Sequence, residues 1–86
     1  MPIICQFFGI VIRMFFDDHP PTHIHAEYQG EKASFDLDGA MIAGRISSPT
    51  AKRLIREWID LNRAKIEADW AKAQRGEPLD PIEPLP

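Results

Sequence analysis

The sequence predicts an α+β fold in which a three- to four-stranded antiparallel meander carries one long C-terminal helix on one face. Two observations lead to this class. Up to residue 46, short segments rich in β-branched and aromatic residues alternate apolar with polar positions, as half-buried strands do. From Thr50 to Gln74, apolar residues instead recur at helical spacing, with no proline or glycine between them. Runs of strands followed by a helix favour a two-layer arrangement.

The strand segments are short and are separated by turn residues. Residues 4–16 predict one long strand or two short ones, with Gly9 marking a bulge or a close approach of another backbone. Residues 23–28, 33–38 and 40–46 continue the meander, because glycine-containing turns join them.

The segment "HIHAEY" sets the expected orientation of the sheet. Successive residues of a strand point to opposite faces, so His23, His25 and Glu27 share one face. The other face carries Ile24, Ala26 and Tyr28. This second set is the more apolar, so we expect it to face the core and the histidines to face outward.

The predicted helix has recognisable ends. Ser48 is a good N-cap, Pro49 suits the first helical position, and Gly76 is a suitable C-terminal cap. About 26 residues at ~1.5 Å each give a helix of roughly 40 Å. That exceeds the width of a small sheet, so we expect the helix to bend or its end near Trp70 to project.

The chain of 86 residues predicts one domain, residues 1–76, followed by a proline-rich C-terminal arm, residues 77–86. The arm is either disordered or docked, on its own chain or on a neighbour in a homodimer. Its apolar residues recur every three positions, the period of a polyproline helix. Trp70 either covers the core or anchors a partner. The candidate partner-binding residues are Trp70, Leu79, Ile82 and Leu85.

Composition narrows the possible partners and cellular compartment of the protein. The net charge of −3 disfavours non-specific binding to nucleic acid or to an anionic membrane. The single cysteine excludes an intramolecular disulfide, and the longest apolar run is far too short to span a bilayer. No secretory signal is visible, so we expect a cytoplasmic protein with no membrane partner.

All three histidines lie within seven positions, in "HPPTHIH", beside the acidic pair Asp17 and Asp18. Two histidines two apart on a strand can converge on one ion, with zinc or a similar divalent metal as the candidate. A third ligand is available from Asp17, Asp18, His19 or Glu27. The metal hypothesis names His19, His23 and His25. No motif requires any other cofactor.

Two further interpretations of the histidines stand beside the metal site. His23 and His25 could serve as acid and base on RNA, with Arg13 holding a phosphate by its fork of donors. Alternatively, the histidines and aspartates form a structural brace that ties the loop to the strand.

The stretch from residue 13 to residue 28 resembles a known family of short bacterial proteins, domain of unknown function 4160. Its core reads roughly R-M-[FY]-x-[DE]-H-x-P-x-H-[FI]-H-A-x-Y, and "REW", "LNR" and "GEPLDPIEPL" extend the likeness. The matching residues are Arg13, Met14, Phe15, Asp17 or Asp18, His19, Pro21, His23, His25, Ala26 and Tyr28.

This resemblance implies a bacterial cytoplasmic protein encoded beside a second small protein, in a pair suspected to be a toxin–antitoxin module. It implies no catalytic residue. We therefore expect a partner-binding component, with the product of the neighbouring gene as partner and RNA as the target if this chain is the toxin. The alternative is a histidine-dependent ribonuclease or metal-dependent hydrolase acting through His19, His23 and His25.

Overall fold

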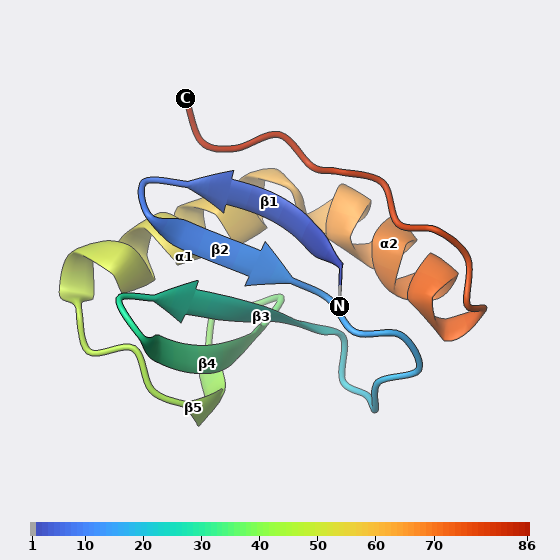
Figure 1. The fold of residues 1–86 in the computed structure, drawn as a ribbon, viewed down its shortest axis with the longest axis horizontal. Helices are drawn as coiled ribbons and strands as arrows, with labels where there is room; N and C mark the ends of the chain where they lie inside the picture. The colour runs from blue at the N-terminus through green and yellow to red at the C-terminus, as the bar shows by residue number, and fades with distance from the viewer. Residues whose placement is uncertain (1) are drawn as a thin grey trace.

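The computed structural model describes residues 2–86 and has the predicted α+β architecture, a sheet with helices on one face (Figure 1). The sheet is an antiparallel meander in which each strand pairs with the next in sequence. Its strands are β1 (Ile3–Phe7), β2 (Ile10–Arg13), β3 (His23–Tyr28), β4 (Glu31–Asp36) and β5 (Met41–Gly44). Five strands form instead of three or four, because the first apolar segment folds back on itself.

The turns that fix the register are two-residue hairpin loops. Phe8 and Gly9 have φ of 49° and 78°, and Gln29 and Gly30 have φ of 48° and 81°. Two successive positive φ values match the turn whose twist suits antiparallel strands. Gly9 therefore makes the β1–β2 turn, and the expectation of a bulge at this position was wrong.

The helical segment covers the predicted residues but divides at Asn62, so it forms two helices, and this break takes the place of the expected bend. Helix α1 (Pro49–Leu61) begins as predicted, with the Ser48 side chain accepting from the Ala51 N–H. Helix α2 (Arg63–Gln74) follows Asn62, whose φ and ψ are −119° and 18°. The Asn62 amide donates to the Trp58 carbonyl at 2.9 Å, and such a side-chain bond competes with the regular helical ladder.

The core lies between the helices and one face of the sheet. Ile24 and Ala26 are fully buried in one cluster with Phe35, Ile55 and Trp58, and Tyr28 packs against its margin. Ile24 and Ala26 therefore face the core as predicted, but His23, which was expected to face outward, is also buried, with 2% of its surface exposed. In the part of the chain that the structure describes, no helix lies over the opposite face of the sheet, which we call the open face (Figure 1).

The proline-rich arm docks on its own chain, past α2 and along β1 (Figure 1). The Ile82 N–H donates to the Ile4 carbonyl at 2.8 Å, and Trp58 Nε1 donates to the Glu83 carbonyl at 2.9 Å. Ile82 is buried, so the arm closes the core at the β1 edge. Among residues 2–86, no helix is long and apolar enough to cross a membrane.

Candidate functional site

The site is built where the loop between β2 and β3 is fastened to the end of α2. The Asp17 N–H donates to the Ala73 carbonyl at 3.3 Å, and Gln74 Nε2 donates to the Asp18 carbonyl at 3.0 Å. These two bonds hold the loop backbone on both sides of the Asp18 Cα. The Asp18 carboxylate therefore lies over the start of β3.

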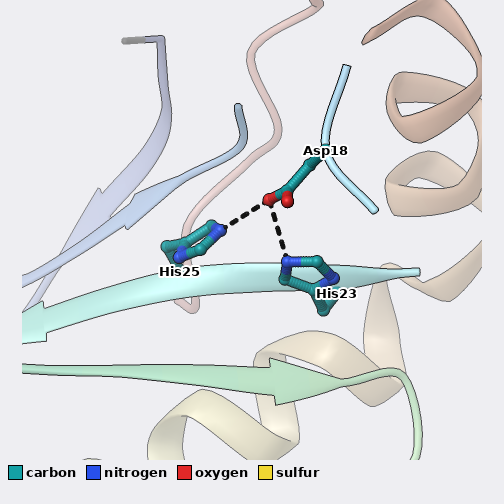
Figure 2. Close-up of side chains that lie close together, drawn as sticks. All are labelled: Asp18, His23 and His25. Atoms are coloured by element: carbon teal, nitrogen blue, oxygen red, sulfur yellow. Dashed lines mark hydrogen bonds and ion pairs between the residues drawn. The ribbon is translucent and has the colours of Figure 1, made fainter. Parts of the chain in front are cut away.

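Asp18 brings the two strand histidines together (Figure 2). Its Oδ2 lies 2.9 Å from His23 Nε2 and 2.9 Å from His25 Nε2. One ligand atom from each residue falls within 4.8 Å of the other two. The side chains of His23, Asp18 and His25 are 3%, 14% and 24% exposed, so the cluster is mostly shielded and is most accessible at His25.

The far nitrogen of each imidazole is also held. His23 Nδ1 lies 2.7 Å from the Pro21 carbonyl, which can only accept, so this nitrogen carries a proton. His25 Nδ1 lies 3.2 Å from Ser34 Oγ, which can donate or accept. The orientation of both rings is thereby fixed at each end.

Aromatic neighbours enclose the two histidines. The Trp70 ring from α2 lies 5.1 Å from the His23 ring, and the Phe15 ring lies 4.1 Å from the His25 ring. These apolar surfaces exclude water from the sides of the imidazoles and lower the local dielectric, which strengthens charge interactions within the cluster.

The contact between Asp18 and His23 needs a further proton or a cation. A neutral imidazole has one N–H, and that of His23 is directed at Pro21. Its Nε2 would then present a lone pair to a carboxylate oxygen 2.9 Å away, and two acceptors would meet. A second proton on His23 or a bound cation resolves this contact. His25 has no such conflict, because its Nε2–H can donate to Asp18 while Ser34 donates to its Nδ1.

The pKa of Asp18 reflects the same arrangement. Partial burial by itself would raise it, but the hydrogen bonds from His25 and from the His19 N–H, with the charges of both strand histidines, hold the pKa below its usual value. Asp18 is therefore an anion at neutral pH and is available as a ligand or as an orienting acceptor.

A hollow on the open face reaches the cluster at His25. Its volume is about 260 Å³, and it lies over the middle of β3 and β4 and beside β5. It is lined by Phe15, His25, Ala26, Glu27, Lys32, Ala33, Ser34, Ala43 and Gly44. A small molecule or an extended chain in this hollow would touch His25 without disturbing the buried His23.

The other residues proposed for chemistry lie beside the cluster. The His19 side chain is 82% exposed, and its Nε2 is 3.8 Å from Asp18 Oδ1, so Asp18 takes the place in the cluster that the metal hypothesis gave to His19. Arg13 is on the open face and donates from Nε to Glu27 Oε2 at 2.6 Å. Its guanidinium is thus engaged with a carboxylate near the hollow.

The candidate partner-binding residues pack within the chain. Trp70 is partly buried and covers His23. Leu79 and Leu85 are also partly buried, and Ile82 is buried, all against the chain's own core.

Comparison with known proteins gives a family and no activity. Neither the curated proteins nor the solved structures include a match to this chain. The family model described as Domain of unknown function (DUF4160) matches residues 9–71. This range contains Asp18, His23 and His25 and ends just after Trp70. The chain belongs to the DUF4160 family, and the carboxylate–histidine cluster lies inside the matched region.

Proposed function

We propose that this protein is a partner-binding component of a toxin–antitoxin-like module in the bacterial cytoplasm. In this proposal it is the toxin, and it acts on RNA through Asp18, His23 and His25. The observation that carries the proposal is the convergence of these three groups on one point, within reach of a hollow on the open face. The two-gene arrangement is taken from the family resemblance.

The chemistry proposed is cleavage of a phosphodiester bond. Such a reaction needs one group to remove a proton from the attacking hydroxyl and another to stabilise or protonate the leaving oxygen. His25 borders the hollow and is oriented by Asp18 and Ser34, so it is the group assigned to substrate contact. Lys32, which is exposed and borders the same hollow, supplies a positive charge for phosphate.

The partner surface proposed comprises Trp70 and the arm, with Leu79 and Leu85; Ile82 is buried against the chain's own core and holds the arm in place. Trp70, Leu79 and Leu85 keep part of their surface exposed. Because Trp70 lies against His23, a protein bound over it would also cover the rim of the cluster. Neutralisation of the toxin by its partner would then follow from steric exclusion.

Co-expression with the neighbouring gene tests this function. We expect induction of the protein alone to arrest growth, and induction with its neighbour to restore growth and to yield a stable complex on size-exclusion chromatography. Free monomer in the presence of the neighbour, together with unaffected growth in both cultures, would contradict the proposal.

A hydrolase that acts without a protein partner is the second candidate. The completeness of the cluster within one chain favours it, since all three groups come from residues 18–25. In that case the purified protein cleaves RNA or another substrate of the hollow, His25→Ala abolishes the cleavage, and the neighbouring gene product changes neither result.

A further inference from the structure

We infer that Asp18, His23 and His25 form a three-ligand site for one divalent transition-metal ion. This inference deepens the function proposed above, in which His25 would then contact the substrate through the ion that it holds and not as an acid or base, and it rests on that function for its biological use. Binding of the ion can nevertheless be measured without any assay of toxicity or cleavage.

The distances fit ligands that share one ion. Two ligand atoms each 2.0–2.1 Å from a metal and at right angles to each other are about 2.9 Å apart. Asp18 Oδ2 is 2.9 Å from both imidazole Nε2 atoms, which corresponds to two edges of one coordination face. The distance between the two Nε2 atoms lies within the 4.8 Å that bounds the group.

The groups behind the ligands are those that metal sites require. A histidine that binds a metal almost always donates its other ring N–H to a carbonyl, carboxylate or water, which fixes the ring and strengthens the ligand. His23 has the Pro21 carbonyl at 2.7 Å, and His25 has Ser34 Oγ at 3.2 Å. Both histidines therefore present Nε2 to the shared point and have a partner for Nδ1.

A cation would also fit the contact between Asp18 and His23. With Nδ1 of His23 directed at the Pro21 carbonyl, its Nε2 and the Asp18 carboxylate face each other at 2.9 Å in a mostly buried site. A divalent ion would accept both of these groups and the Nε2 of His25 as ligands.

The donor set indicates which ion. Two imidazoles and one carboxylate suit zinc and the divalent ions of iron, manganese and cobalt, whereas calcium and magnesium prefer oxygen ligands alone. Three protein ligands leave positions for water or substrate, as in catalytic rather than structural sites.

Calorimetric titration of the untagged, metal-free protein with zinc and with cobalt(II) tests the inference. We expect one ion per chain. His25→Ala should weaken binding by at least about 100-fold. Ser34→Ala, which removes only the group behind His25, should weaken it by about 10- to 100-fold. His19→Ala is the matched control and should bind as the wild type does, since His19 is exposed and outside the cluster.

Circular dichroism of each metal-free variant shows whether it is folded. Folded wild-type protein that binds neither ion would overturn the inference, and so would equal losses in His19→Ala and His25→Ala. These outcomes are separate from those of the function. Growth arrest by a protein that binds no metal would refute the metal site and leave the toxin proposal standing. Stoichiometric metal binding without growth arrest or RNA cleavage would support the metal site and contradict the toxin proposal.

Discussion

Replacement of Asp69 by asparagine should stabilise the protein at neutral pH. Asp69 lies on α2 beneath the arm and is only 2% exposed. Its Oδ1 accepts the Asp80 N–H at 3.0 Å, but its Oδ2 has no hydrogen-bond partner among residues 2–86. Burial raises the pKa of Asp69, and the nearby Asp80 charge adds to this, while the Asp80 N–H and Lys72 oppose it.

The size of the expected stabilisation follows from the unpaired Oδ2 of Asp69. A buried acceptor that is left without a partner costs about 1–3 kcal/mol, and more where it is charged. Asparagine keeps an oxygen for the Asp80 N–H, and its neutral amide costs less to bury than a carboxylate. We expect Asp69→Asn to raise the free energy of unfolding by about 1–2 kcal/mol at pH 7. At roughly 4–8 °C per kcal/mol for a domain of this size, the increase in Tm should be evident.

The pH dependence of this stability difference tests whether the ionisation of Asp69 is its cause. The pKa of Asp69 in the folded protein lies above the value of 3.8 for an unperturbed aspartate. Below pH 3.8 the folded and unfolded states are both protonated, so the substitution should have little effect. The cost to the wild type develops as the pH rises from there through the raised pKa, and it is complete above that pKa.

Thermal denaturation followed by circular dichroism, at several pH values from about 3.5 to 7, measures this difference. Asp60→Asn, at an exposed position of α1, is the matched control and should change Tm little. An Asp69→Asn protein no more stable than wild type at pH 7 would refute the reasoning. A gain of equal size at acid and neutral pH would refute it too.

Three further substitutions test other parts of the structure by denaturation. Asp18→Asn should lower the free energy of unfolding by about 1–3 kcal/mol at pH 7. Since the pKa of Asp18 is lowered in the folded protein, this difference should shrink as the pH falls below 3.8 through that pKa. A difference that stays constant with pH would argue against a stabilising role for the Asp18 carboxylate. Ile82→Ala should cost about 2–4 kcal/mol if the arm closes the core, and a negligible effect would mean that the arm is not docked in solution. Gly44→Ala places a Cβ 2.3 Å from the Lys32 carbonyl, so it should destabilise more than Gly30→Ala, which adds only left-handed strain of about 1–2 kcal/mol; equal losses would contradict the close approach.

The fold class was predictable because its signals are local. Alternation identified β3 with its observed bounds and β4 with bounds two residues too late, 33–38 instead of Glu31–Asp36, and the apolar set of β3 indicated which face meets the helices. Ser48, Pro49 and Gly76 marked the ends of the helical segment. At its C-terminal end, the Gly76 and Glu77 N–H groups satisfy the Ala73 and Lys72 carbonyls, as a glycine cap predicts.

The break between α1 and α2 was not predictable from propensity alone. Asn62 is a moderate helix former, and no proline or glycine marks the position. Its effect depends on a side-chain bond to the carbonyl of Trp58, one turn earlier. That bond and the change of helix direction depend on tertiary packing.

Of the candidate site, the two strand histidines were predictable from the sequence, but the carboxylate that joins them was not. Strand alternation places His23 and His25 on one face whatever surrounds them. Which of the nearby acidic residues joins them depends on the path of the loop. That path is set by the bonds of Asp17 and Asp18 to the last turn of α2, more than fifty residues away.

Growth after tightly controlled induction tests most directly whether the Asp18–His23–His25 cluster carries the activity. Wild type should be compared with His25→Ala and with His19→Ala, and circular dichroism should establish that each protein is folded. The account predicts that wild type and His19→Ala arrest growth and that folded His25→Ala does not. Equal growth of all three cultures, or equal arrest by all three, would contradict it.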